Sequence, residues 1–184
     1  GTGGMLDVCL GPDRPVDATR SSNGTFPIVC WARGGEVMWG LEALMLSCGT
    51  NVQWLRDDLG IIDSAADSEA VARGCESSDG VVYVPAQIGL GTPRWDYGAR
   101  STLLGLTRGT TRHHVTRAVL EGIAHRGVDL VDAAEADSGI RLETLRVDGG
   151  MTDNGLFVQM LADLSGRPVE ISPIRDATAL GAGL

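Results

Sequence analysis

Residues 143–154 read Glu-Thr-Leu-Arg-Val-Asp-Gly-Gly-Met-Thr-Asp-Asn, and this stretch decides how the chain folds. It predicts a short apolar strand at 144–147 that ends in Gly149-Gly150, followed by a helix over 153–164. Paired glycines after a strand let a flat ligand approach the backbone. The helix start offers N–H groups and a positive dipole end to an anion. The same pattern is also typical of a plain tight turn, so it predicts a ligand site only together with other features.

The residues on either side of this stretch extend it to an α/β layer. Residues 168–171 predict a second strand, so that the segment reads strand–helix–strand, a unit that is parallel and right-handed. Upstream, residues 112–134 predict the longest helix, with an apolar stripe that includes Val115, Val119 and Ile123. Strands and helices that alternate in this way indicate an α/β domain.

The first half of the chain predicts a hairpin of strands and then shorter elements. A helix from Gly49 places Val52, Leu55 and Leu59 on one face. Residues 85–100 predict a long ordered loop, a kind of segment that is often functional. The other predicted elements are strands at 5–10, 26–32, 36–41 and 81–84, a short helix at 68–73, and a last helix that starts near Ala177.

Composition excludes several function classes. A net charge of −9 over 184 residues argues against non-specific binding to nucleic acid or to an anionic membrane. No apolar run approaches the ~18 residues of a membrane helix, and no signal peptide is visible. The four cysteines lack C-x-x-C spacing, so neither a zinc site nor a disulfide scaffold is expected, and the cytoplasm is the expected compartment.

The two ends predict a piece of a longer protein. The chain opens on Gly-Thr-Gly-Gly without an initiator methionine, and residues 177–184 read as a helix without a stop signal. We therefore expect a domain that is incomplete at both ends.

The order of these motifs resembles the second half of a ribonuclease-H-like, actin-like ATPase, and more closely the FGGY carbohydrate kinase family. A family signature fits residues 101–121: Ser101, Leu103, Gly105-Leu106, His114-Val115 and Ala118-Val119-Leu120-Glu121 occupy its constrained positions. Residues 53–57, 105–109, 136–142 and 145–150 most resemble the members that phosphorylate glycerol. The resemblance implies that residues 1–184 are the C-terminal nucleotide-binding domain of a two-domain, ATP-dependent kinase.

The resemblance also implies which residues bind which ligand. Thr2 would face the terminal phosphates of ATP, and Gly49 and Gln53 would contact the nucleotide. Gly150 would leave room for adenine, and Asn154 could offer it a donor and an acceptor. Mg²⁺ would arrive with the phosphates rather than in a protein cage, so no metal ligands are assigned.

The expected substrate-binding residues match the family less completely than the expected nucleotide-binding residues do. Met5 stands where glycerol-phosphorylating members carry an aromatic residue against the polyol carbons, and Gln87 and Arg94 also replace aromatic residues. The catalytic base, an Asp, is expected in an N-terminal kinase domain before Gly1, so no catalytic residue is assigned in this chain. The implied reaction converts glycerol to glycerol 3-phosphate. Another polyol or sugar kinase, a non-catalytic nucleotide-binding module, and the oligomeric state all stay open.

Overall fold

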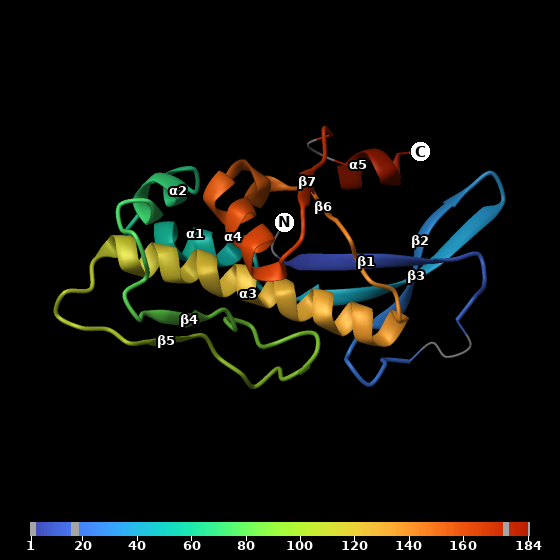
Figure 1. Ribbon diagram of the computed structural model, residues 1–184, viewed down its shortest axis with the longest axis horizontal. Coiled ribbons are helices and arrows are strands. Elements are labelled where there is room, and N and C mark those ends of the chain that lie inside the picture. The colour runs from blue at the N-terminus through green and yellow to red at the C-terminus, as the bar shows by residue number, and fades with distance from the viewer. Residues whose placement is uncertain (1–2, 16–18, 175–176, 184) are drawn as a thin grey trace.

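The structure is a computed structural model that describes residues 3–15, 19–174 and 177–183. Figure 1 shows a long helix with strands and shorter helices around it. In chain order the elements are β1 (Gly4–Gly11), β2 (Phe26–Arg33), β3 (Glu36–Met45), α1 (Gly49–Asp57), α2 (Asp67–Ala72), β4 (Val82–Val84), β5 (Thr102–Leu104), α3 (Arg112–Ser138), β6 (Leu145–Val147), the 3-10 helix η1 (Gly150–Asp153), α4 (Gly155–Ser165), β7 (Val169–Ile171) and α5 (Ala177–Ala182).

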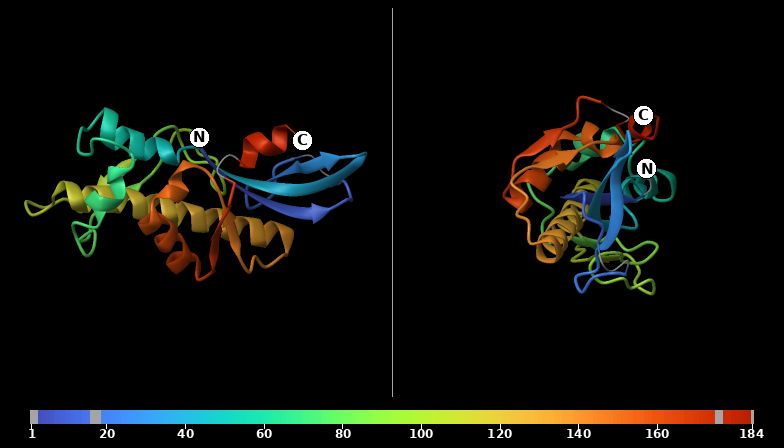
Figure 2. Two further views of the ribbon diagram at one scale, coloured as in Figure 1. Left: turned by 90° about the horizontal axis from the view of Figure 1, so that it is seen from above. Right: turned by 90° about the vertical axis from the view of Figure 1, so that its right-hand side faces the viewer.

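The first three strands form an antiparallel sheet in the order β1-β3-β2. The predicted β2–β3 hairpin is confirmed, and its turn residues Gly34 and Gly35 have the positive φ angles that favour glycine. Strand β3 continues to Met45, four residues past the predicted end, because Ala43 and Met45 are buried in the core. The hairpin projects from the body of the molecule (Figures 1 and 2).

Helix α3 is the element on which most of the others pack. It contacts β1, β3, β4, α2 and α4, and its buried face includes Val119, Ile123 and Leu130. Its start is fixed by a capping box between Thr111 and His114. The helix ends four residues later than predicted, where Gly139 adopts the left-handed conformation typical of a helix C-terminus.

The predicted strand–helix–strand unit is confirmed as β6–α4–β7, with β6 and β7 parallel. The helix begins later than predicted, because residues 150–153 form the 3-10 turn η1 and Asn154 caps α4. Leu156, Met160 and Leu161 are buried as expected, whereas Leu164 is 39% exposed. In α1 the expectation for Leu59 is wrong, because the helix ends at Asp57 and Leu59 is exposed.

The 85–100 loop is ordered by contacts with the β1–β2 connection. The Trp95 indole N–H and the Thr92 hydroxyl both donate to the carbonyl of Gly24, at 2.7 and 3.0 Å. The Arg126 guanidinium donates to the Thr92 carbonyl from the side of α3. The loop leads into β5, a short strand beside β4 that the sequence did not predict.

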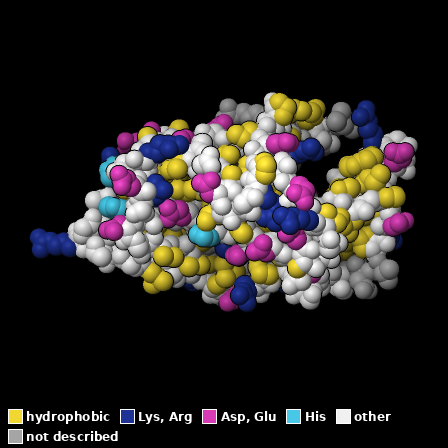
Figure 3. Space-filling model, viewed as in Figure 1, with side chains coloured by type: hydrophobic (Ala, Val, Ile, Leu, Met, Phe, Trp, Pro, Cys, Tyr) yellow, Lys and Arg dark blue, Asp and Glu magenta, His cyan; other side chains and the backbone are white. Residues whose placement is uncertain are grey.

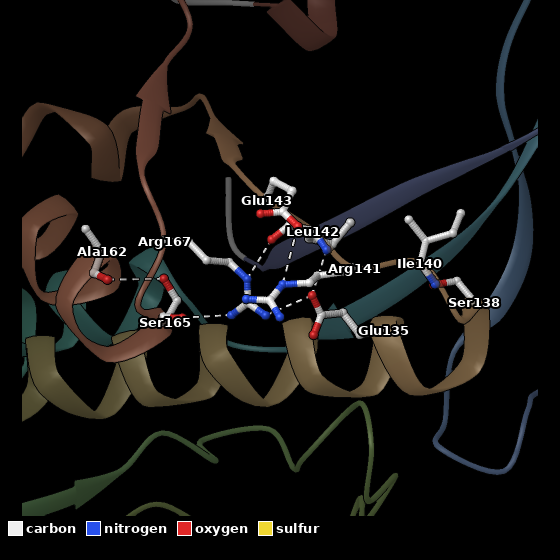
Figure 4. A network of polar contacts seen from close by, with 9 residues as sticks. All are labelled: Glu135, Ser138, Ile140, Arg141, Leu142, Glu143, Ala162, Ser165 and Arg167. Carbon is white, nitrogen blue, oxygen red and sulfur yellow. Dashed lines mark hydrogen bonds and ion pairs between the residues drawn. The ribbon is translucent and has the colours of Figure 1, made fainter.

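An ion-pair network ties the end of α3 to the α4–β7 turn (Figure 4). Arg167 donates to the Glu135 carboxylate at 2.8 Å and to the Leu142 carbonyl at 2.6 Å. Glu135 also accepts from the Leu142 N–H at 2.7 Å. This N–H, against the opposing effect of burial and with help from Arg167, holds the pKa of Glu135 below its usual value.

Strands β1 and β6 lie over the same part of α3 but do not pair with each other in the described residues. Leu6 of β1 and Leu145 of β6 belong to one hydrophobic cluster that includes Val131 of α3. Leu6, Asp7 and residues 142–146 line a depression of about 300 Å³. The edge of β1 opposite β3 is therefore not covered by a neighbouring strand in the described residues.

Candidate functional site

An open depression of about 530 Å³ lies beside helix α1. Gln53 lies on the exposed side of this helix and lines the depression. Gly49 is the first residue of the helix. Gln87 and Ser101, which lie outside α1, belong to the same lining. The fold thus brings Gln53, a predicted ligand residue of α1, into the same depression as Ser101, the first residue of the family signature. The residues that line the depression are Thr50, Gln53, Trp54, Asp57, Asp58, Gln87 and Ser101.

A buried polar network holds this wall of the depression in place. The Tyr83 hydroxyl donates to Asn51 Oδ1 at 2.8 Å and lies 3.1 Å from the Ser101 hydroxyl. Ser101 Oγ also accepts from the Ala86 N–H at 2.9 Å. Burial raises the pKa of Tyr83, so its hydroxyl remains a hydrogen-bond donor. The Tyr83 ring stacks on Trp54, with 5.9 Å between centroids.

Asn51 also fixes the backbone that leads into α1. The side chain is fully buried, and its Nδ2 donates to the carbonyls of Ser47 and Cys48 at 3.0 and 2.8 Å. Satisfied buried amides of this kind are costly to disturb, because each lost partner leaves a desolvated polar group. Sequence reasoning missed Asn51, because a single polar residue on a short helix gives no periodic signal of burial. It missed the role of Tyr83, because the pattern of strand β4 does not show which distant residue the hydroxyl bonds.

The described part of the glycine-rich N-terminal stretch lies against the start of α1. A Cβ at Gly4 would lie 3.4 Å from the Cβ of Cys48, and a Cβ at Gly3 would lie 2.8 Å from the carbonyl oxygen of Met45. Only a glycine at position 3 lets the backbone lie this close to Met45. The stretch therefore runs beside the residues that precede Gly49. Thr2, the predicted phosphate contact, lies outside the described residues.

The β6–α4 connection carries the two predicted adenine contacts. Gly149 has a φ of 89°, and Gly150 is exposed, with nothing within 4 Å of the position that a Cβ would occupy. Asn154 is 8% exposed. Its Oδ1 accepts from the Phe157 N–H at 2.9 Å, and its Nδ2 donates to Ser68 Oγ at 3.0 Å. Asn154 is thus the cap of α4 and a link to α2, while Gly150 leaves an open surface beside it.

The start of α4 is occupied by protein groups. Glu69 of α2 accepts from the Gly155 N–H at 2.9 Å. Burial opposes ionisation of Glu69, but hydrogen bonds from Arg73 and from the backbone of Gly155 and Leu156 hold its pKa below the usual value. A carboxylate of the protein already accepts from this helix start, in the place that the sequence pattern offers to an anion. The surface at Gly150 suits a neutral group instead.

Met5 lies on β1, where it pairs with Leu44. Its side chain is 62% exposed, and its sulfur lies 3.8 Å from the position that a Cβ at Gly3 would occupy. The predicted substrate residue and the glycine-rich stretch are therefore neighbours. Arg94, which also stands where an aromatic residue is expected, is exposed and lies on the 85–100 loop.

The described residues contain neither a ready metal site nor a helix that could span a membrane. No group of three or more His, Cys, Asp or Glu side chains there is arranged to hold a metal ion. Among the same residues, no helix is both long enough and apolar enough to cross a membrane.

Similarity to known proteins extends over the whole chain. A sequence profile described as "FGGY family of carbohydrate kinases, C-terminal domain" matches residues 1–184. Glycerol kinase of Geobacillus kaustophilus is 48% identical over 165 residues, which is 90% of this chain and 33% of that protein. Glycerol kinase 2 of Thermotoga maritima is 47% identical over the same shares. The chain thus spans about a third of the length of these relatives.

Solved structures show the same fold. Plasmodium falciparum glycerol kinase with ADP superposes with a TM-score of 0.85 at 35% identity, over 99% of this chain and 36% of that one. The ligand-bound xylulose kinase of Lactobacillus acidophilus superposes with a TM-score of 0.77 at 21% identity, over 100% and 36% of the two chains, and shows the fold alone. The chain belongs to the FGGY family of carbohydrate kinases, of which it forms a C-terminal domain.

Proposed function

We propose that the protein to which this chain belongs transfers the terminal phosphoryl group of ATP to a hydroxyl group of glycerol, producing glycerol 3-phosphate. The observation that carries the proposal is the 48% identity to glycerol kinases across 90% of the chain. Because the chain spans only a third of those relatives, the rest of the protein must supply the base and most of the polyol pocket.

We assign the nucleotide to the surface between α1 and the β6–α4 connection. Gly150 offers an open, uncharged surface for the adenine ring. Asn154, whose amide already bonds Ser68 and Phe157, would shape this surface as the cap of α4. The polar side of the nucleotide runs toward Gly49, Gln53 and the glycine-rich stretch that contains Thr2. Glycine-rich turns suit phosphates because their N–H groups can approach closely.

We also propose that Mg²⁺ binds together with the phosphates of ATP. Mg²⁺ keeps several waters and binds phosphate oxygens, and the described residues hold no ready cluster of ligands. The cytoplasm is the proposed compartment, because the four cysteines are free thiols and a reducing environment keeps them so.

Substrate turnover tests the proposal directly. The full-length protein is assayed for ADP release with ATP and Mg²⁺ against glycerol, erythritol, xylulose and gluconate in turn. We expect the highest kcat/KM with glycerol. A higher value with xylulose or gluconate would identify a different member of the family. ATP binding without turnover of any of the four would favour the non-catalytic module.

A further inference from the structure

Two free cysteines flank the middle strand of the antiparallel sheet. Cys9 of β1 lies directly opposite Gly40 of β3. Cys30 of β2 lies where the register between β2 and β3 shifts, between Val29 and Trp31, so it has no partner of its own in the ladder. An unpaired residue at such an irregularity is re-aimed relative to its neighbours. The two thiols approach the same residue of β3 from its two sides.

Gly40 leaves the space in which these thiols meet. A Cβ at Gly40 would lie only 2.3 Å from Cys30 Sγ, so the Cys30 thiol occupies the place of the missing side chain. Any other residue at this position would fill the gap between Cys30 and Cys9. Because Gly40 has no side chain, Cys9 and Cys30 can approach each other across β3.

The backbone and the electrostatics agree with this proximity. Strands β1 and β2 come within 8 Å of each other between Cα atoms, whereas strands on either side of a third lie about 9.5 Å apart in a flat sheet. Burial, followed by the neighbouring Cys9 and Asp7, raises the pKa of Cys30 to about 11. A hydrogen bond with Cys9 also contributes to this rise.

We propose that Cys9 and Cys30 are an oxidation site, at which a disulfide forms across β3 and joins the two outer strands of the sheet. The oxidant is a low-molecular-weight disulfide. Cys9 is exposed and Cys30 is half-buried, so the oxidant reaches Cys9 first. The two thiols lie on separate strands whose alignment depends on β3, and the link would fix that alignment covalently.

The reaction proceeds in two balanced exchange steps. The Cys9 thiolate attacks the disulfide R–S–S–R, forms Cys9–S–S–R and releases one thiolate. The Cys30 thiol then loses its proton and attacks the Cys9 sulfur, which forms Cys9–S–S–Cys30 and releases the second R–S group. Two protein thiols are oxidised and one R–S–S–R is reduced to two R–SH. The high pKa of Cys30 makes the second step the slower one.

The link would lie on the strand that also carries Met5. Side chains alternate along a strand, so Met5, Asp7 and Cys9 share one face of β1. Oxidation would thus stiffen the strand next to the proposed substrate residue. It would leave the polar network around Asn51 and Tyr83 untouched.

The experiment uses the reduced full-length protein and glutathione disulfide as the oxidant. After exposure, remaining thiols are alkylated and the protein is digested with trypsin without reduction. Arginines place the four cysteines in separate peptides: Cys9 precedes Arg20, Cys30 lies in 21–33, Cys48 in 34–56 and Cys75 in 74–94. We expect the Cys9 and Cys30 peptides to be joined within one molecule, with Cys48 and Cys75 alkylated, and dithiothreitol to reverse the link.

Effective concentration predicts the balance between products. Thiols held in one molecule react at an effective concentration on the order of millimolar, about a thousandfold above a second molecule at micromolar concentration. The internal link should therefore exceed intermolecular dimers by about that factor. Glutathione retained on Cys9 while Cys30 is alkylated, or a link from Cys9 to Cys48, to Cys75 or to a second molecule, would overturn the proposal.

Two variants separate the pair from general thiol reactivity. In Cys30→Ser the first step still occurs, so we expect Cys9 to retain one glutathione. Cys75→Ser removes another half-buried free thiol, at a residue whose carbonyl accepts from Arg117 of α3. This variant should form the Cys9–Cys30 link at the wild-type rate. A link that persists in Cys30→Ser or disappears in Cys75→Ser contradicts the assignment.

Discussion

At the scale of single residues, Gly150 is the sharpest test of the nucleotide site. Nothing lies within 4 Å of a Cβ at this position, and its φ is not in the left-handed region, so the fold accommodates a larger residue. We expect Gly150→Val to weaken ATP binding at least tenfold, about 1.4 kcal/mol, because the valine would occupy the place of the base. Calorimetry on the full-length protein measures it.

A matched variant controls for the loss of glycine itself. Gly181 is equally open and lies on α5, so Gly181→Val should bind ATP as the wild type does. If Gly150→Val binds ATP as tightly as the wild type, the adenine does not lie at this turn.

Met5 belongs to the same scale and concerns the substrate. Methionine is flexible and can repack around a larger polyol, whereas an aromatic wall is rigid. We expect Met5→Phe to raise the ratio of kcat/KM for glycerol to kcat/KM for erythritol. The increase should stay within the ~1–3 kcal/mol by which an apolar pocket discriminates one methylene. Leu10→Phe, at another exposed apolar residue of β1, is the control. An unchanged ratio in Met5→Phe would show that this residue does not line the pocket.

At the scale of elements, Asp137 joins the end of α3 to the β1–β2 connection. Its carboxylate accepts hydrogen bonds from Asn23 Nδ2 at 2.8 Å, from the Thr25 hydroxyl at 2.7 Å and from the Ser21 hydroxyl. Burial opposes ionisation, but these donors hold the pKa of Asp137 below 3.8. The connection packs in turn against Trp95, so one carboxylate supports both the sheet and the long loop.

This lowered pKa predicts a pH dependence of stability. A depressed pKa adds stability above the unfolded value of 3.8, and the contribution is lost as the pH falls through the folded value. We expect Asp137→Asn to lower the free energy of unfolding near neutral pH and to flatten its decline between about pH 5 and 3. Urea unfolding across this range measures it. Asp132→Asn, at an exposed site on the same helix, should keep the wild-type slope.

At the scale of the whole molecule, hydrophobic side chains remain exposed over the β2–β3 hairpin. Figure 3 shows them on the right, at the end of the molecule away from α2. Val29, Trp31 and Val37 are 47%, 44% and 37% exposed. Together with the edge of β1 that no described strand covers, this surface fits a domain that works as part of a larger protein. The chain spans about a third of the length of its glycerol kinase relatives.

The isolated 184-residue chain is therefore expected to lack kinase activity. Phosphoryl transfer depends on positioning and charge stabilisation by groups on both sides of a cleft, and removal of a general base alone costs about 10²–10⁴ in rate. A coupled assay of ADP release with glycerol checks the purified chain against the full-length protein. Glycerol-dependent turnover by the chain alone would contradict the expectation.

The sequence by itself determined the family, the α/β class and the parallel β6–α4–β7 unit, because these depend on local patterns: alternation, helical periodicity and glycine at turns. It also identified the 85–100 loop and the open turn at Gly150. Only the tertiary structure decided that Glu69 fills the start of α4, that Asn51 and Tyr83 hold the wall of the depression, and that Cys30 meets Cys9 over Gly40. The pairs Glu69–Gly155 and Asn51–Tyr83 are 86 and 32 positions apart, and Cys9 and Cys30 are also far apart in the sequence. No local pattern records which distant side chain will satisfy a buried polar group.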